Sequence, residues 1–328
     1  MDDYNAHPPF LLDILHQYAS HSLAWSCLQP RMRFFGEANI GLIPYRTWMG
    51  QCVVLGDPLC APDQMQVLLE PFLQQHRNAL FMQIHHRTAV LLKTRGYHAT
   101  PVGVENEIDT ATFELSGKRK RDLRHYRNKA RQGIVTVSEE TDCRPLREEL
   151  DAVSDAWLPM KSWFSRELEF LARPFQLEPE PEVRVFVGRI AGRAGAFTIL
   201  DPMYGSGRIL GYTVTILRHC PDAPEGAVDA INLFAIERLR AEGVPVLSLG
   251  ISPFYHMPEQ AAREGRGKPA PYWLYRALYH WGGPIYHFKG LSFHKSRYRA
   301  REVPMFTAIR APLGLLPLYA SARVCKML

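Results

Sequence analysis

The chain has 328 residues, 46% of them hydrophobic and 22% charged, which is the balance of a packed globular protein and excludes a disordered chain or a fibre. The formal charge of +6 favours an anionic partner such as nucleic acid, a phospholipid headgroup or a phosphate ligand. The six cysteines include no CxxC pair, so we expect reduced thiols in a cytoplasmic protein and neither disulfides nor a zinc site.

Membrane insertion is not expected from this sequence. Residues 1–10 are polar and acidic, whereas a secretory signal is basic and then apolar. No stretch approaches the roughly 18 uninterrupted apolar residues of a helix that spans a bilayer. We therefore expect no transmembrane segment and a location in the cytoplasm or peripherally at the inner face of the membrane.

The first third of the chain alternates helical and strand-like patterns. Residues 10–28 carry apolar residues at helical spacing. Strand-like runs bounded by glycines follow at residues 31–35, 38–48 and 51–60. An amphipathic helix, a buried strand and a helix that closes at Gly96 are then predicted over residues 63–77, 79–85 and 89–100. This alternation predicts an α/β sheet with helices packed on it.

A similar succession begins after a basic stretch at residues 117–133. Residues 146–161 predict a helix, and residues 183–202 predict two strands. A strand, a helix and a strand follow at residues 208–218, 227–243 and 244–253, and this order implies a parallel crossover. Residues 284–298 and 302–311 close the second half.

Two α/β halves of similar length predict a duplicated fold. The expected parts are an N-terminal domain, a basic linking helix, a C-terminal catalytic domain and an amphipathic tail, at residues 1–116, 117–133, 134–310 and 311–328. The tail combines leucines with Arg323 and Lys326. This pattern is typical either of a segment that lies on a membrane surface or of a helix packed on the protein's own core.

The basic stretch, GKRKRDLRHYRNKARQG, is the most distinctive segment. Its cations crowd about four helical turns. Leu123, Tyr126 and Ala130 recur at spacings of three and four, so one helix face can be anchored while the rest is presented. Because like charges at this density repel one another, an anionic partner would relieve a cost. A solvated helix between the two halves is the alternative interpretation.

The loop before residues 227–243 is a second candidate site. Pro221 and Pro224 end the preceding strand, and Gly226 opens the helix, whose backbone amides and dipole suit a phosphate. Acidic Asp222 and Glu225 could instead cap the helix. The segment lacks a glycine-rich loop, so it is a poor signature for coenzyme A.

The third candidate is FKGLSFHKSRYR, which contains Lys295 and Arg297. In an extended segment both side chains would point the same way and could clamp a phosphate or stabilise an oxyanion. Alternatively, the two cations only pair with nearby Asp or Glu. His85 and His86 lack further ligands for a metal, and Asp57 is expected to bond to local backbone amides in a turn. No GxSxG, P-loop or GxGxxG motif occurs.

Five blocks in this order resemble the cytosolic catalytic domain of the phosphatidylglycerol lysyltransferases and their alanyl relatives. They are VVLGDPL, GKRKRDLRHYRNKARQG, LRHCPDAPEGAVDAI, VPVLSLGISP and YHFKGLSFHKSRY. The resemblance extends from about Leu23 to Ile309. It implies two tandem acetyltransferase-like (GNAT-like) halves, each a mixed sheet flanked by helices, joined by a basic helix. It also implies transfer of an aminoacyl group from aminoacyl-tRNA to a lipid hydroxyl.

Individual residues are carried over from the resemblance by position. Arg218 corresponds to the arginine of the family's strand motif, and Lys295 and Arg297 to its C-terminal basic pair. Thr215 departs from the family, which has Asp three residues before the strand arginine. If that carboxylate holds the ammonium group of the transferred amino acid, its loss brings an aminoacyl donor into question. The residues expected to bind the tRNA acceptor end or the substrate are Lys118, Arg121, Arg124, Asn128 and Gly226.

The leading hypothesis is aminoacyl transfer from a charged tRNA to a phosphatidylglycerol-like lipid or another hydroxyl or amine acceptor. Lys295, Arg297 and Arg218 would hold phosphate and stabilise the oxyanion, with His219 and His294 as candidate bases by proximity alone. No metal is expected, and no cofactor apart from aminoacyl-tRNA as co-substrate. Because the family's membrane-embedded flippase half is missing from this sequence, the acceptor would be reached by peripheral contact or would be a soluble one.

Two further functions are compatible with the same residues. One is an acyltransferase of the same fold that uses acyl-CoA or an acyl-carrier protein, whose acidic surface would dock on the basic helix. Thr215 favours this alternative, since a neutral acyl chain needs no carboxylate partner. The other is an RNA- or lipid-binding module without catalysis.

Overall fold

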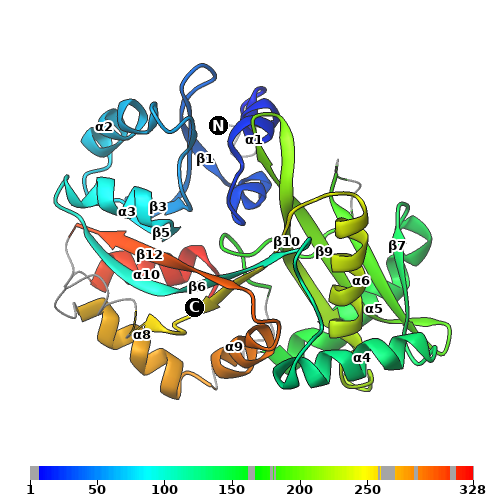
Figure 1. The fold of residues 1–328 in the computed structure, drawn as a ribbon. Coiled ribbons are helices and arrows are strands. Elements are labelled where there is room, and N and C mark those ends of the chain that lie inside the picture. Colours follow the sequence, from blue (N-terminus) through cyan, green and yellow to red (C-terminus); the bar gives the residue numbers. More distant parts are fainter. Residues whose placement is uncertain are drawn as a thin grey trace.

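The computed structural model describes residues 7–161, 167–177, 180, 182–257, 259, 270–283, 287–310 and 315–327. The expected polar start (residues 1–6) and the first part of the predicted tail (residues 311–314) lie outside the described residues. The fold is a mixed sheet of α/β type flanked by helices (Figure 1). This arrangement confirms the predicted fold class at the level of the sheet and its helical layers.

The elements up to residue 109 follow the predicted succession except at the last strand. They are α1 (Leu11–Tyr18), η1 (Ala24–Leu28), β1 (Arg33–Glu37), β2 (Gly41–Trp48), β3 (Gln51–Leu55), β4 (Leu59–Cys60), α2 (Met65–Gln75), β5 (Leu80–Ile84), α3 (His86–Lys93) and β6 (His98–Asp109). The sequence pattern did not predict β6, because Pro101 and Gly103 are atypical of strands and because Glu105 and Asn106 put polar side chains at buried positions.

The later elements begin with the basic helix. They are η2 (Lys118–Lys120), α4 (Arg121–Arg131), β7 (Thr136–Glu140), η3 (Arg144–Leu146), α5 (Arg147–Lys161), β8 (Arg184–Ile190), β9 (Arg193–Gly205), β10 (Arg208–His219), α6 (Ala227–Ala241), β11 (Val246–Pro253), α8 (Ala270–Trp281), α9 (Phe288–Ser296), β12 (Arg301–Ile309) and α10 (Leu315–Val324). The predicted crossover is confirmed, since β10 and β11 pair in parallel on either side of α6 in the sequence.

One continuous sheet unites the two halves of the chain. Its strand order is β1-β2-β3-β5-β12-β6-β11-β10-β9-β8-β7, with β4 paired to β2. The two halves exchange strands: β6 pairs antiparallel with β11, while β12 lies between β5 and β6. The last strand of each predicted half is therefore hydrogen-bonded to the other half.

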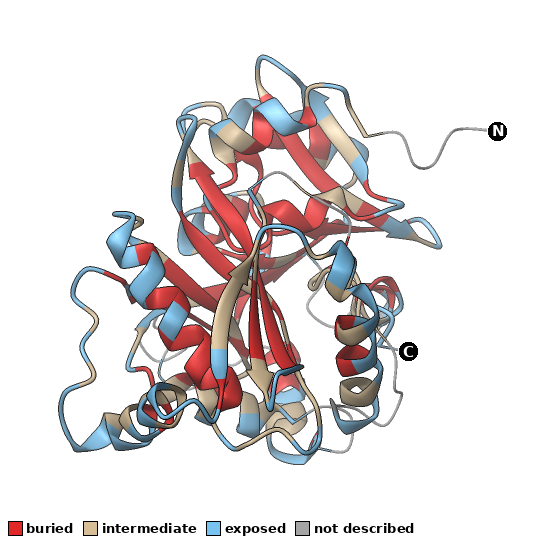
Figure 2. Cartoon of the chain, turned by 90° about the vertical axis from the view of Figure 1, so that its right-hand side faces the viewer, coloured by how far each residue is buried: buried red, intermediate tan, exposed pale blue. Residues whose placement is uncertain are grey.

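Helices cover both faces of the second half of the sheet. On one face α6 packs with α4, through Leu123 and Tyr126 of the basic helix. On the other face α5 packs against β9 and β10 through Leu150 and Val153. Buried residues accordingly run along the strands, and exposed residues lie on the outer sides of the helices (Figure 2).

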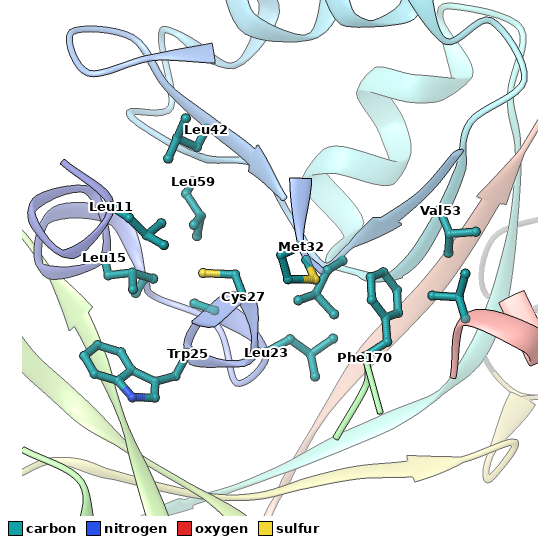
Figure 3. Packing of buried hydrophobic residues seen from close by; sticks show 14 of the residues in the cluster. Leu11, Leu15, Leu23, Trp25, Cys27, Met32, Leu42, Val53, Leu59 and Phe170 are labelled. Atoms are coloured by element: carbon teal, nitrogen blue, oxygen red, sulfur yellow. The ribbon is translucent and has the colours of Figure 1, made fainter. Parts of the chain in front are cut away.

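The segment 167–177 connects this second half to the first. Phe170 is fully buried in the core cluster of the first half, where Figure 3 places it near Leu23, Met32 and Val53. The helix α10 contacts β2 and β3, so the described part of the predicted tail packs on the protein's own core. Across the described ranges, no helix combines the length and the apolar character needed to cross a bilayer.

Candidate active site

The middle of the sheet contains a break between two neighbouring strands. β10 and β11 pair only over Gly211–Thr213 and Val246–Ser248, although both strands continue well beyond these residues. The register of each strand against its other neighbour also shifts there, between Val214 and Ile216 in β10 and between Ser248 and Ile251 in β11. Backbone groups that leave a ladder need other hydrogen-bond partners, and side chains or ligands can supply them.

Lys295 of α9 places its ammonium group at this break. Its Nζ donates a 2.7 Å hydrogen bond to the carbonyl oxygen of Ile251, and the residue is only 8% exposed. A Cβ atom on Gly250 would lie 3.5 Å from that Nζ and 3.7 Å from the carbonyl oxygen of Val214 in β10. A buried cation therefore lies beside backbone groups from both separating strands, where it could stabilise a developing negative charge.

The predicted pairing of Lys295 and Arg297 on one face is wrong. The sequence would place the two side chains together only in an extended segment, but residues 288–296 form helix α9, with Arg297 as its C-cap. Side chains two residues apart on a helix are rotated by about 200° around its axis, because each residue adds about 100°, so they lie on nearly opposite sides. The two cations consequently have different partners.

Arg297 connects three helices through a buried ion pair. Its Nη2 donates to Oδ1 and Oδ2 of Asp229 in α6, at 3.2 and 2.9 Å, and its Nη1 donates to the Tyr126 hydroxyl of α4 at 3.3 Å. Asp229 is 3% exposed and also accepts a 2.7 Å hydrogen bond from the Tyr298 hydroxyl. The ion pair that the sequence left open as an alternative is thus present.

Two histidines near these cations differ in their tautomers. The His294 Nδ1 lies 2.7 Å from Arg297 Nη2, and because a guanidinium only donates, this nitrogen must accept. Burial, together with the charges of Arg297 and Lys295, lowers the pKa of His294, although Asp229 opposes the shift. The His219 Nδ1 lies 2.9 Å from the carbonyl oxygen of Cys220 and therefore donates. The neutral His219 ring keeps its basic lone pair on Nε2.

Gly226 lies where the basic helix crosses the start of α6. It is the N-cap of α6 with φ of 84°, and a Cβ there would overlap the Tyr126 ring. The Tyr126 hydroxyl donates to Glu225 Oε1 at 2.7 Å, and Lys129 Nζ donates to the Glu225 carbonyl oxygen at 3.3 Å. The helix start that we predicted as a phosphate site is therefore in contact with α4.

The predicted tRNA-facing residues divide into two groups. Lys118, Arg121 and Asn128 are exposed. Arg124 is half-buried and donates from Nη1 to the carbonyl oxygens of Leu115 and Gly117, at 2.8 and 2.7 Å. Arg124 therefore helps to hold the turn that leads into the basic helix, and the exposed cations are better placed to meet an anion.

Arg218 lies on the face of the sheet that α5 covers. Its Nη1 hydrogen-bonds to Ser154, and its Nη2 donates to both carboxylate oxygens of Glu167, at 2.6 and 2.8 Å. The guanidinium carbon lies about 5 Å from the ring centroids of Trp157 and Phe175 (5.0 and 5.1 Å). The structure therefore does not bring Arg218 together with Arg297, which bonds to α6 on the opposite face.

Thr215 falls in the irregular part of β10, beside a buried carboxyl group on β9. Asp201 is fully buried, and Arg173 Nε lies 3.1 Å from its Oδ2. Burial raises the pKa of Asp201 to about 6, against the opposing effects of the Arg173 charge and the Thr215 hydroxyl. Neither carboxylate oxygen has a well-aligned hydrogen-bond donor among the described residues. A carboxyl group thus lies next to Thr215 although residue 215 itself is neutral.

A second buried polar network was not predicted from the sequence. Glu105 is 2% exposed and accepts hydrogen bonds from Ser248 at 2.6 Å and from Ser22 at 2.9 Å. Nearby, the His85 ring Nδ1 lies 2.5 Å from Asp57 Oδ2, and the His85 backbone amide donates to the same carboxylate at 3.1 and 3.3 Å. Asp57 thus bonds to a residue 28 positions away, and the prediction that it bonds to amides of its own turn is not confirmed. These residues come from five separate segments, and no motif spacing could have identified them.

Comparison with known proteins agrees with this fold. Residues 12–309 match the family model described as phosphatidylglycerol lysyltransferase, C-terminal. The phosphatidylglycerol lysyltransferase of Bacillus subtilis strain 168 is 27% identical over 312 residues, which are 93% of this chain and 35% of that protein. The enzyme of the same name from Staphylococcus epidermidis is 28% identical over 280 residues, 83% of this chain and 32% of the relative.

A solved structure shares the whole fold. The structure of L-PGS from Bacillus licheniformis superimposes with a TM-score of 0.79 at 24% sequence identity, covering 98% of this chain and 97% of that one. The chain spans about a third of the length of the curated relatives that it matches.

Proposed function

The chain belongs to the family of phosphatidylglycerol lysyltransferase C-terminal domains, and we propose that it transfers an aminoacyl group from aminoacyl-tRNA to a hydroxyl of phosphatidylglycerol or a similar anionic glycerolipid. The names of the relatives support the lipid acceptor. The observation that carries the proposal is the buried Lys295 ammonium at the break between β10 and β11.

The proposed reaction exchanges one ester for another. The lipid hydroxyl oxygen attacks the carbonyl carbon of the aminoacyl ester, and the C–O bond to the terminal ribose of the tRNA breaks. The proton leaves the lipid hydroxyl and ends on the ribose oxygen. Lys295 would stabilise the negative charge on the former carbonyl oxygen in the tetrahedral intermediate, and removal of one such donor typically costs about 100- to 1000-fold in rate.

His219 is the better candidate for the base that carries this proton. Its Nδ1 donates to a backbone carbonyl, so Nε2 can accept a proton and return it. The accepting Nδ1 of His294 is already engaged by Arg297.

Asp201 supports an aminoacyl donor over a neutral acyl donor. The neutral Thr215 favoured an acyl-carrier substrate, but the Asp201 carboxyl lies beside it from the neighbouring strand. Arg173 Nε lies 3.1 Å from this carboxylate, but neither oxygen has a well-aligned hydrogen-bond donor among the described residues, so the group could also accept from an ammonium group. We therefore propose that Asp201 compensates for the missing aspartate at position 215.

The proposal extends to the partner surface and to the duplicated fold. Exposed Lys118 and Arg121 on the basic helix would contact phosphates of the tRNA acceptor end.

Two acetyltransferase-like halves joined by this helix are supported by a repeated crossover. The strands β3 and β5 are parallel and flank α2 in the sequence, as β10 and β11 are parallel and flank α6. The protein would act peripherally on the cytoplasmic leaflet.

The test is a transfer assay with labelled aminoacyl-tRNA and phosphatidylglycerol vesicles. We expect a labelled lipid whose formation is abolished when the tRNA is digested with RNase beforehand. Lys295→Met should lower the rate by about 100-fold or more. Arg77→Met, which removes an exposed cation just after α2 in the other half, is the matched control and should leave the rate unchanged. A labelled lipid that forms equally well after RNase treatment would refute the proposal.

A further inference from the structure

Helix α8 presents an aromatic face to the outside of the protein. Trp273, Leu274 and Trp281 are 53%, 42% and 79% exposed. Leu274 follows Trp273 by one residue and Trp281 follows it by eight, so the three side chains lie within about a third of the helix circumference. The opposite side of α8 is buried through Tyr272 and Tyr275. Tyrosines therefore form the buried side of α8, and tryptophans form its exposed side.

This face is held in place by aromatic packing. The Phe254 ring, directly after β11, stacks on Tyr275 at 5.1 Å between centroids and meets Phe288 of α9 edge-on at 5.0 Å. The Tyr279 and Ser292 hydroxyls join α8 to α9 at 3.2 Å. A surface fixed in this way needs little ordering when it binds a partner.

Helix α9 packs against α8 and carries a further exposed aromatic side chain. Phe293 is 68% exposed, and it precedes Lys295 by two residues. Because α9 runs from α8 to the Arg297 contact with α4, the three helices follow one another along one edge of the molecule (Figure 1). Among the exposed aromatic residues, Phe293 therefore shares helix α9 with Lys295, and the two tryptophans lie on the neighbouring helix α8.

The charged side chains of α8 and α9 themselves are of one sign. Arg276 lies beside the Trp273 ring, with its guanidinium carbon 5.9 Å from the centroid, and Lys289 donates to the carbonyl oxygen of His280 at 3.3 Å. Neither α8 nor α9 contains an aspartate or a glutamate. A cationic rim around exposed aromatic side chains complements an anionic surface that has an apolar interior.

We propose that the α8–α9 face docks on the surface of an anionic lipid bilayer, with Trp273, Trp281 and Phe293 inserted at the level of the headgroups. Tryptophan is the side chain that membrane–water interfaces favour, because one end of its ring is apolar and the other donates a hydrogen bond. Docking here would bring lipid headgroups to the end of α9 that carries Lys295. The inference rests on the proposed function in one respect, namely that the acceptor is a lipid.

Vesicle sedimentation tests the docking without any transfer reaction. The wild-type chain should bind phosphatidylglycerol vesicles and bind phosphatidylcholine vesicles at least 10-fold more weakly. The triple variant Trp273→Ala, Trp281→Ala, Phe293→Ala should lose at least 10-fold in binding to phosphatidylglycerol vesicles. Met49→Ala, at a residue as exposed as Trp281 (79%) in the turn between β2 and β3, is the control and should bind as the wild type does.

A second variant separates the charges from the aromatic groups. Arg276→Gln with Lys289→Gln should weaken binding at low salt and make it less dependent on salt. Unchanged binding of the triple variant would overturn the proposal. A second outcome would also overturn it: the wild-type chain does not bind vesicles but forms dimers, and the triple variant is monomeric. The α8–α9 face would then bind a second copy of the protein.

Transfer assays distinguish a failure of docking from a failure of the proposed function. The triple variant should lose transfer to phosphatidylglycerol in vesicles but keep transfer to a short-chain, water-soluble phosphatidylglycerol. Equal losses on both acceptors would overturn the docking role. If the wild type binds vesicles through this face and transfers to neither acceptor, the docking surface stands and the aminoacyl transfer is refuted.

Discussion

Lys295 Nζ donates a 2.7 Å hydrogen bond to the carbonyl oxygen of Ile251, at the point where β11 has separated from β10. This bond holds the ammonium group on the sheet although Lys295 comes from a helix. The glycine beside it has φ of 73°, and a Cβ there would contact the ammonium group at 3.5 Å. The carbonyl group that holds Lys295 thus directly follows a residue whose φ favours glycine.

Gly250→Ala should disturb this arrangement. We expect a loss of about 1–2 kcal/mol in the free energy of unfolding, because a residue with a Cβ is strained at this φ. We also expect a loss of transfer activity at temperatures where the variant is fully folded, because relief of the strain at residue 250 would move the adjoining Ile251 carbonyl oxygen that holds the Lys295 ammonium. Urea unfolding and the transfer rate would be measured together. Full activity in a folded Gly250→Ala variant would contradict a dependence of the Lys295 contact on the backbone at residue 250.

The ion pair of Arg297 and Asp229 should contribute mainly to stability. Asp229→Ala leaves Arg297 without its carboxylate partner in a largely buried site, and removal of one member of such a pair costs about 3–5 kcal/mol. The double variant Asp229→Ala, Arg297→Met should be less destabilised than the sum of the two single variants, as measured by urea unfolding. Strictly additive losses would show that the two groups do not interact.

The His85–Asp57 pair should make stability depend on pH on the alkaline side. Burial acts to lower the pKa of His85, but the hydrogen bond and charge of Asp57, with smaller effects of Glu105 and Glu107, raise it to about 9. This stabilisation is fully present below about pH 6.5 and is lost as the pH rises through about 9. Thermal unfolding of the wild type should therefore decline across this range. His85→Gln should remove that part of the decline, and an unchanged profile would contradict the assignment.

The exposed cations of the basic helix should control tRNA binding. Lys118→Glu with Arg121→Glu should weaken binding and lower the slope of log affinity against log salt, by about 0.7–0.9 for each phosphate that the variant no longer neutralises. Arg124→Glu should instead lower stability, because Arg124 holds the carbonyl oxygens of Leu115 and Gly117. Filter binding across a salt series and thermal unfolding would separate the two effects. A double variant with wild-type affinity would place the tRNA elsewhere.

Gly226 should tolerate no side chain while Tyr126 is present. Gly226→Ala combines an unfavourable φ of 84° with a Cβ that overlaps the Tyr126 ring. We expect a loss of about 2 kcal/mol or more in the free energy of unfolding. In a Tyr126→Ala background the same change should cost only about 1 kcal/mol, since the backbone strain persists and the overlap is gone. Equal costs in both backgrounds would contradict the close approach of α4 and α6.

Several features were predictable because they depend on neighbours along the chain. The apolar residues Leu123 and Tyr126 recur at helical spacing, and they are the buried side of α4. The order of strand, helix and strand from residue 208 to 253 required a parallel crossover, which β10, α6 and β11 form. The family followed from five motif blocks in order, and the match over residues 12–309 agrees with it.

Other features required the folded chain. Residues 288–297 have neither a clear helical nor a clear alternating pattern, so only the structure shows that Lys295 and Arg297 diverge. The exchange of β6 and β12 between the halves depends on which strand edges meet.

The sequence by itself determined the order of most elements, the basic helix and the family, because periodic burial and motif spacing are local properties of a chain. The tertiary structure alone decided which cation reaches the break in the sheet and which carboxyl lies beside Thr215. Those contacts join strands and helices far apart in the sequence, and their side chains are placed by burial and by hydrogen bonds between segments.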